Sequence, residues 1–281
     1  MRDMGETLRT TFRRAFRLEN RRVAVRHGRL EHVNGFESKI LGNRRDVTVY
    51  LPAGYDERGD RRYPVLYMHD GQNLFEDHRA FIPGQHWRLA EAANESIGNR
   101  RAGAMIIVGV DNAGADRIDE YTPTRDEQRN AGGRAADHAR MLFEELKPLI
   151  DEKYRTLGDR DHTAIGGSSL GGLVSFWTAI THPQAIGRAA VMSPSVWWND
   201  RAVVRDLDAF EGARPRIWLD IGGREGSEAL NDARMLRDRL RQKGWVDDVD
   251  FRYYEDRRAD HSERAWAARA GKMLEFLFPP A

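Results

Sequence analysis

The chain of 281 residues contains no cysteine. Disulfide bonds, thiol catalysis and thiolate metal sites are therefore excluded, since each requires a cysteine sulfur. An excess of charge of one sign is also missing, because 45 lysines and arginines nearly cancel 44 aspartates and glutamates. Without such an excess, the molecule as a whole has no field that would recruit nucleic acid or an anionic membrane. We expect no nucleic-acid partner.

Long apolar runs are missing too, since no stretch approaches the roughly 20 apolar residues that span a bilayer. The first 22 residues lack the apolar core of a signal peptide. They do place Leu8, Phe12, Ala15 and Phe16 at helical spacing among arginines, which is a short basic amphipathic pattern. We expect an arm that lies on the domain without inserting into a membrane, and a cytoplasmic protein.

Strand-like and helix-like patterns alternate along the rest of the chain. Residues 63–68 and 104–110 are continuous apolar runs, typical of strands covered on both faces, and 45–51 alternates like a half-buried strand. Further strands are expected over 163–165, 189–192, 216–221 and 250–254, and helices over 86–97, 137–154, 170–180, 203–210, 228–242 and 264–277. This alternation predicts an α/β fold with a mostly parallel sheet and helices on both faces. We expect one domain over 38–281, preceded by an arm and a possible first strand over 1–37.

Two connections between these elements bear on a site. The polar segment 112–136 is long for a connector and follows the carboxyl end of a strand, where open α/β sheets bind their ligands. The segment after Met192 is too short for the helical lid that many α/β-hydrolases insert there. The sequence therefore predicts no large lid domain and an open cleft.

A G-x-S-x-G motif, formed by Gly167, Ser169 and Gly171, stands between an expected strand and an expected helix. This context is typical of a nucleophile elbow, a sharp turn that holds a serine in a strained backbone conformation. Glycines flank the serine because the strand and the helix pass too close for a Cβ atom. Ser169 is therefore the candidate nucleophile.

A serine hydroxyl needs a general base, and the base is oriented by an acid. On a fold with such an elbow, the chain order is serine, acid, histidine. His261 follows the last expected strand and precedes the closing helix, which fits the base. His182 ends the elbow helix on the far side of the sheet, and His69 is expected to shape the cleft.

The acid is expected just after the strand 216–221. Glu225 lies in the loop at that strand's carboxyl end, where a side chain can reach an imidazole, and it is favoured. The alternatives are Asp220, Asp256 and Asp260.

Acyl transfer also needs N–H donors for the oxyanion of the tetrahedral intermediate. One is the backbone N–H of the residue after the nucleophile, here Leu170, and the other comes from a loop after an early strand. The segment 69–73 fills that place, and Gly71 lets the chain turn so that the N–H of Gln72 points into the cleft.

Candidate substrate contacts are Asp70, Tyr121, Trp197 and Trp198. The two tryptophans follow a strand at the cleft edge, where we expect one of them, and not both, to line the pocket. The acidic residues of 111–120 match no metal-binding loop, so we expect no metal and no cofactor.

Eight motifs occur in a familiar order: RDVTVYLPAGYD (45–56), RRYPVLYMHDGQNLF (61–75), RIDEYTP (117–123), EELKPLIDEKYRT (144–156), GGSSLGGL (166–173), SPSVWW (193–198), LDIGGREGS (219–227) and DHSERAW (260–266). Together they resemble the Putative esterase family of α/β-hydrolases, which includes esterase D, enterochelin esterases, feruloyl esterases and mycolyl transferases. The resemblance implies an α/β-hydrolase fold, Ser169 as nucleophile and His261 as base. The mycolyl transferases imply Gln72 as an oxyanion donor. Feruloyl esterases usually carry aspartate where this chain has Glu225, and the siderophore-ester relatives imply a further alternative, a serine–histidine pair without an acid.

These features predict a serine esterase that hydrolyses carboxylic esters of small molecules through an acyl-enzyme. The alternatives are an acyltransferase to a sugar or lipid alcohol, or a binding module that has lost the chemistry. The family acts on siderophore lactones, aryl and feruloyl esters, sugar acetates and thioesters, and the sequence selects none of them. It also does not specify an oligomeric state.

Overall fold

A sheet of eight strands forms the centre of the computed structural model, which describes residues 27–57 and 59–280. The strand order is β1-β2-β4-β3-β7-β8-β9-β10. From β4 to β10 all neighbours pair in parallel, whereas β2 pairs antiparallel with both β1 and β4. The mostly parallel sheet is as predicted.

The strands fall close to the predicted apolar runs: Asn43–Leu51 (β2), Val65–His69 (β3), Ile106–Val110 (β4), Thr163–Ser168 (β7), Arg188–Met192 (β8), Arg216–Gly222 (β9) and Phe251–Asp256 (β10). An additional strand, β1 (Arg29–Ser38), pairs with β2 along the sheet edge. The possible first strand within residues 1–37 is therefore present. Its residues 29–37 are part of the central sheet and not of an arm that precedes the domain. The folded domain therefore begins before residue 38, the boundary that the sequence predicts.

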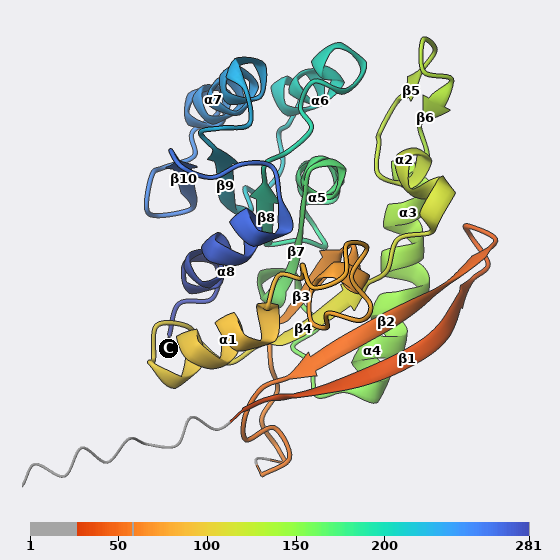
Figure 1. Ribbon diagram of the computed structural model, residues 1–281, viewed down its shortest axis with the longest axis vertical. Coiled ribbons are helices and arrows are strands. Elements are labelled where there is room, and N and C mark those ends of the chain that lie inside the picture. The colour runs from red at the N-terminus through yellow and green to blue at the C-terminus, as the bar shows by residue number, and fades with distance from the viewer. Residues whose placement is uncertain (1–26, 58, 281) are drawn as a thin grey trace, which may run out of the picture.

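Helices cover both faces of the sheet: Leu89–Gly98 (α1), Arg117–Glu120 (α2), Ala135–Arg140 (α3), Lys147–Lys153 (α4), Leu170–Thr181 (α5), Trp198–Asp208 (α6), Ser227–Gln242 (α7) and Glu263–Leu277 (α8). In Figure 1, α1 and α8 lie together on one face, and α5, α6 and α7 lie on the other. The predicted helix 137–154 is α3 and α4 joined by a π-type segment, Met141–Leu146. The helix expected from residue 86 begins at Leu89.

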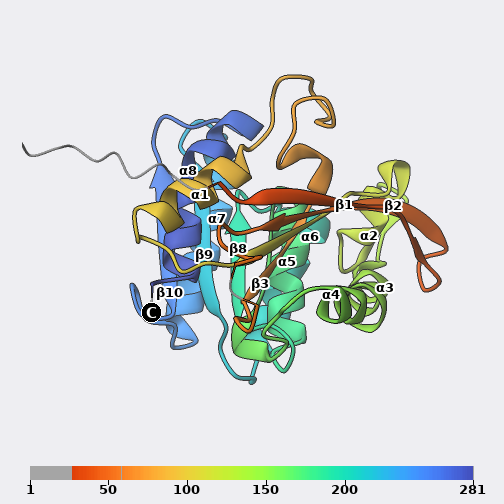
Figure 2. The ribbon, with the colours of Figure 1, turned by 90° about the horizontal axis from the view of Figure 1, so that it is seen from below.

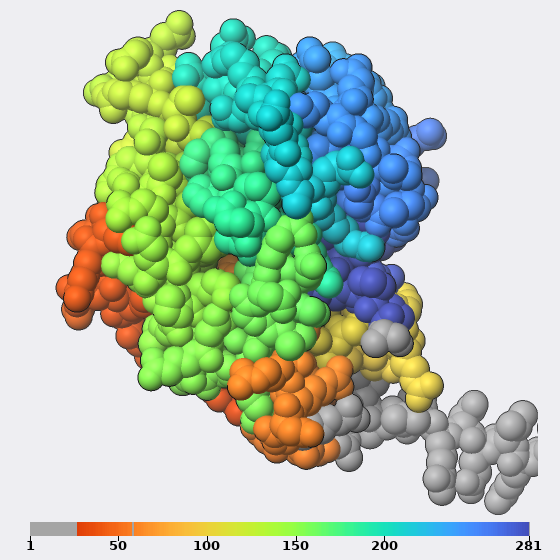
Figure 3. All heavy atoms as spheres, turned by 180° about the vertical axis from the view of Figure 1, so that it is seen from behind, coloured from red at the N-terminus to blue at the C-terminus, as the bar shows by residue number. Residues whose placement is uncertain are grey.

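Two apolar cores lie on opposite faces of the sheet, and β3 shows why. Val65 and Tyr67 belong to the core beneath α3 to α7, while Leu66 and Met68 belong to the core beneath α1 and α8. Successive side chains of a strand point to opposite faces, so a strand buried on both sides is apolar throughout. Seen from behind, the segments coloured green to cyan close over one face as a continuous layer of atoms (Figure 3).

The long segment 112–136 has structure of its own. It contains α2 and a small hairpin of β5 (Arg125–Asp126) and β6 (Ala131–Gly132). The hairpin stands away from the main sheet at the upper right of Figure 1. Between β8 and β9 the chain forms α6 and no additional domain, which agrees with the prediction that a large lid is absent.

The remaining predictions concern the ends of the fold. The amphipathic pattern of residues 8–16 and the rest of the predicted arm up to residue 26 lie outside the described residues. Among the helices that the structure describes, none has both the length and the apolar character needed to cross a bilayer. Figure 2, from below, shows β1 and β2 running together as a ribbon toward the edge of the molecule.

Candidate active site

Ser169 alone makes the turn between β7, which ends at Ser168, and α5, which begins at Leu170. Its φ of 57° and ψ of −122° are values that residues with a side chain normally avoid. A Cβ atom added to Gly167 would lie 2.9 Å from the carbonyl carbon of Gly171. The strand and the helix thus pass as closely as the motif predicts, and the serine is held at a strained elbow.

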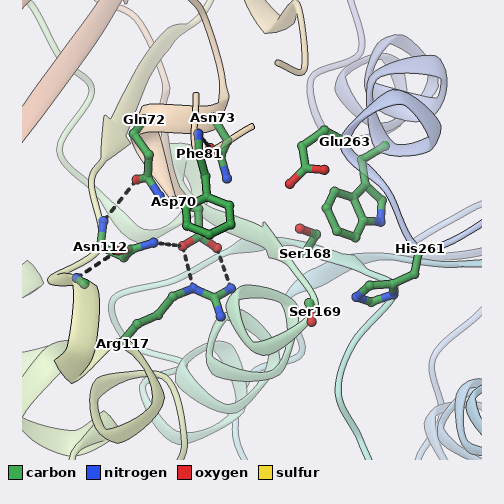
Figure 4. Close-up of a pocket in the computed structure, with 12 residues that line it drawn as sticks. Asp70, Gln72, Asn73, Phe81, Asn112, Arg117, Ser168, Ser169, His261 and Glu263 are labelled. Atoms are coloured by element: carbon green, nitrogen blue, oxygen red, sulfur yellow. Dashed lines mark hydrogen bonds and ion pairs between the residues drawn. The ribbon is translucent and has the colours of Figure 1, made fainter. Parts of the chain in front are cut away.

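Ser169 opens onto a cavity of about 390 Å³ at the carboxyl ends of the strands. Figure 4 shows its two sides, with Ser169, His261 and Glu263 on one and a polar cluster on the other. The polar cluster consists of Asp70, Gln72, Asn112 and Arg117. The structure therefore brings the candidate nucleophile, base and oxyanion loop to one place.

His261 lies in the loop between β10 and α8, with about half of its side chain exposed. Its Nδ1 is 2.7 Å from Oε2 of Glu225, which lies in the loop after β9 and is buried. Burial alone would raise the pKa of Glu225, but hydrogen bonds from His261 and Ser193 outweigh it and hold that pKa below its ordinary value. An ionised carboxylate only accepts, so Nδ1 carries the proton and Nε2 is left as the free base.

The other candidate acids have different partners. Asp220 is fully buried and accepts hydrogen bonds from Trp218 Nε1 at 2.7 Å and from Arg269 Nη2 at 3.0 Å. Asp256 accepts from a backbone N–H in its own loop, and Asp260 accepts from the hydroxyl of Ser262. Of the four carboxylates, Glu225 is the one that contacts His261 within the described part of the chain.

The hydroxyl of Ser169 is hydrogen-bonded to another serine. Its Oγ lies 3.3 Å from Oγ of Ser195, and among residues 27–57 and 59–280 no hydrogen bond joins it to His261. The side chains of Ser169 and His261 line the same cavity. Catalytic hydrogen bonds are commonly loose without substrate and tighten when it binds.

The loop that faces Ser169 follows β3 directly. Asp70 turns the chain with a φ of 56°, and a short helical turn, η1 (Gly71–Asn73), comes next. A Cβ atom on Gly71 would lie 2.5 Å from the carbonyl carbon of Gly109 in β4, so only glycine fits there. Gln72 lines the cavity, and Leu170 opens α5, where backbone N–H groups have no partner within the helix.

Asp70 is held on the cavity wall by several groups. Arg117 donates to both carboxylate oxygens at 2.7 and 2.8 Å, and Asn112 Nδ2 donates at 2.7 Å. The hydroxyl of Tyr121 accepts from the N–H of Asp70 at 3.2 Å, and its ring is fully buried. Tyr121 therefore supports the loop from behind, and its predicted contact with substrate is not what the structure shows.

One of the two tryptophans, Trp197 or Trp198, is expected at the pocket, and both lie elsewhere. Trp198 is buried, and its Nε1 donates to the carbonyl of Thr124 at 2.8 Å. Trp197 is 40% exposed and packs against the guanidinium of Arg129. Neither lines the cavity that contains Ser169; its aromatic walls are Phe81 and Trp266.

Sequence reasoning missed these two aromatic residues. Trp266 belongs to the motif that carries His261 and lies five residues beyond it, in the first turn of α8, and its ring packs edge-on against the imidazole with the ring centroids 4.9 Å apart. That spacing was a usable signal. No sequence signal indicated Phe81, because it lies in an irregular loop and is 82% exposed.

A buried ion pair fixes the segment that carries Arg117. Arg45 in β2 donates to both carboxylate oxygens of Glu120 at 2.9 Å, and both side chains are fully buried. His138 Nδ1 lies 3.3 Å from the same carboxylate. Burial opposes ionisation of Glu120, yet the hydrogen bonds from His138 and Arg45 lower its pKa to about 2.

We expect Glu120→Gln to lower the free energy of unfolding by about 3–5 kcal/mol at pH 7, because it leaves a buried guanidinium without its counter-charge. A carboxyl with a lowered pKa stabilises the fold above its ordinary pKa, 4.5 for Glu120, and that contribution is lost as the pH falls toward 2. Urea unfolding at several pH values checks this, with the gap between wild type and variant narrowing below pH 4.5. An unchanged gap would contradict it. Glu144→Gln, in an exposed pair with Arg140, is the control and should cost at most about 1 kcal/mol.

Comparisons with known proteins show which family the chain belongs to. The family model described as "Putative esterase" matches residues 38–277. The uncharacterized protein YbbA of Bacillus subtilis is 26% identical over 221 residues, which cover 74% of this chain and 82% of that protein. The ferri-bacillibactin esterase BesA of the same organism is 28% identical over 196 residues, 63% of this chain and 64% of that protein.

A solved structure shows the same fold. The crystal structure of the BES protein from Bacillus cereus has a TM-score of 0.71 and 23% identity, and the match covers 89% of this chain and 94% of that one. The predicted α/β-hydrolase fold is thus confirmed. The chain belongs to the Putative esterase family of α/β-hydrolases and is a carboxylic-ester hydrolase.

Proposed function

We propose that the chain is a serine esterase that works through an acyl-enzyme, with Ser169 as nucleophile, His261 as base and Glu225 as the acid that orients the base. The observation that carries this proposal is the 2.7 Å contact between His261 Nδ1 and buried Glu225, beside the cavity where Ser169 stands at its elbow. It leaves Nε2 of His261 free to take a proton.

The reaction begins when Oγ of Ser169 attacks the ester carbonyl carbon and His261 Nε2 takes the hydroxyl proton. The carbonyl oxygen becomes an oxyanion, which accepts hydrogen bonds from the backbone N–H groups of Leu170 and Gln72. Each such donor is worth roughly 10²–10³ in rate. The tetrahedral intermediate collapses, the alcohol leaves with the proton from His261, and the acyl group stays on Ser169. Water then attacks the acyl-enzyme by the same steps and releases the acid.

The cavity favours a small-molecule ester with both aromatic or apolar parts and polar groups. Phe81 and Trp266 supply apolar surface, while Asn112 and the guanidinium of Arg117, which is 27% exposed, supply hydrogen-bond donors. The relative BesA is named for a siderophore ester, ferri-bacillibactin. A fluorophosphonate probe, which bonds covalently to activated serines, tests the proposal directly, since it is expected to label Ser169.

Phe81→Ala is expected to change substrate preference without changing stability. The ring lies at the mouth of the cavity and is 82% exposed, so its loss should alter the free energy of unfolding by less than about 0.5 kcal/mol. Loss of its contact with a bound acyl chain should raise KM for p-nitrophenyl butyrate about threefold to tenfold. KM for the acetate should change less. Equal changes in KM for both esters would show that Phe81 does not contact the acyl group.

A further inference from the structure

Ser193 carries a buried hydroxyl group that contacts the carboxylate of Glu225. It follows β8, is 2% exposed, and has a left-handed backbone with a φ of 42°. It is not among the residues that line the cavity of Ser169. A substrate in that cavity therefore does not reach it, and any effect of Ser193 on the reaction passes through its neighbours.

Three groups meet at the Oγ atom of Ser193. Trp266 Nε1 donates to it at 3.0 Å, and Arg269 Nη2 donates to it at 2.9 Å. An indole N–H and a guanidinium have no acceptor atoms, so these two donors occupy both lone pairs of the hydroxyl. The proton of Ser193 is left with one direction, toward Oε1 of Glu225 at 2.6 Å. Its neighbours thus make Ser193 an obligatory donor to Glu225.

The arginine of this network is itself fixed by a buried carboxylate. Arg269 Nη2 lies 3.0 Å from Oδ1 of Asp220, and both side chains are almost completely buried. The other oxygen of Asp220 accepts from Trp218 at 2.7 Å. Asp220, one of the alternative candidates for the acid, therefore neutralises Arg269 at the base of the network and leaves Glu225 to contact His261.

The two carboxylate oxygens of Glu225 have different hydrogen-bond partners. Oε1 accepts from the hydroxyl of Ser193 and from the backbone N–H of Gly222 at 2.7 Å. Oε2 is left for His261. A carboxylate with one oxygen bound by two donors has one orientation, and charge-assisted hydrogen bonds of this kind are strong.

We propose that Ser193 is a positioning residue, which holds Glu225 ionised and in the one orientation that directs the imidazole of His261. This rests on the proposed function, in which Glu225 orients the base. The energetic cost of this arrangement supports a role beyond packing, because a buried ion pair is often less stable than apolar residues of the same size and a left-handed serine is less stable than a glycine.

The test begins with single variants assayed on p-nitrophenyl acetate. Ser193→Ala is expected to lower kcat about tenfold to a hundredfold and to leave KM within twofold, because Ser193 does not line the cavity. Ser193→Gly should behave alike, and its backbone suits a φ of 42°, so it serves where the alanine variant folds poorly. The matched control is Ser38→Ala, which removes another buried serine that donates to a glutamate, Glu145, at 2.6 Å; it should keep the wild-type kcat.

A double-mutant cycle with Glu225→Ala separates positioning from general loss of structure. If Ser193 acts through Glu225, removing its hydroxyl should cost nothing further once the carboxylate is gone. The same fall in kcat in both backgrounds would overturn the proposal, as would a wild-type kcat for Ser193→Gly alongside an impaired Glu225→Ala. An unimpaired Glu225→Ala would instead overturn the proposed acid itself, and the positioning role with it.

Discussion

Ser169→Ala is expected to reduce the hydrolysis of p-nitrophenyl acetate by a factor on the order of 10⁴–10⁶, because it removes the atom that forms the acyl-enzyme. The neighbouring hydroxyls of Ser168 and Ser195 do not replace it, since each lies on a side chain at least 95% buried. Neither has the partly exposed position that Ser169 has at the elbow.

The same substitution should leave the fold intact. Within the part of the chain that the structure describes, Oγ of Ser169 makes a single hydrogen bond, to Ser195, so its loss should change the free energy of unfolding by about 1 kcal/mol or less. Thermal or urea unfolding of the purified variant checks this beside the assay. Retained turnover in a folded variant would remove Ser169 from the mechanism, whereas an unfolded variant would make Ser169→Cys the replacement test, with the rate on the ester still expected to fall.

Glu225→Gln is expected to lower kcat on the order of 10²–10⁴-fold, and the geometry around the side chain explains why. The hydroxyl of Ser193 and the N–H of Gly222 both donate to Oε1, so the amide oxygen of a glutamine must take that place. Its NH₂ group then faces Nδ1 of His261 as a donor. Nδ1 must accept, the ring proton moves to Nε2, and the imidazole no longer takes the proton of Ser169.

Steady-state kinetics on the same ester measures this effect. Asp256→Asn is a matched control, since it also neutralises a carboxylate near the carboxyl end of a strand, one that contacts its own loop and not His261. That control should stay within about twofold of wild type, because surface changes away from a site have small effects. A rate for Glu225→Gln close to that of wild type would instead support a serine–histidine pair that works without an acid.

The parts of the fold that the sequence predicts are those governed by local pattern. Buried parallel strands such as β3 and β4 must be apolar on both faces, so they are visible as short runs. The elbow is visible because close packing of strand and helix requires glycine at fixed positions. The sequence pattern indicates β1 only as a possible strand without bounds, because β1 lies at the sheet edge with many exposed residues and an irregular register between Val33 and Phe36.

The parts that the sequence does not predict depend on how distant segments meet. Large aromatic side chains such as those of Tyr121 and Trp198 are typical of a ligand-binding wall, but tertiary packing buries both of them in the protein interior. The choice between Glu225 and Asp220 depends on which carboxylate lies nearer to Arg269, a residue of α8: its Nη2 is 3.0 Å from Asp220 and 3.9 Å from Glu225. The role proposed for Ser193 depends on contacts with two distant segments, the loop after β9 that carries Glu225 and the helix α8 that carries Trp266 and Arg269.

Labelling with a fluorophosphonate, followed by peptide mapping, tests the central claim most directly. The account predicts one adduct per chain, on Ser169, with loss of esterase activity in proportion to labelling and protection by an ester substrate. Prior denaturation should abolish labelling, because the reactivity of the serine depends on His261 and Glu225. An adduct on a different residue, or full inactivation without an adduct on Ser169, would contradict the account.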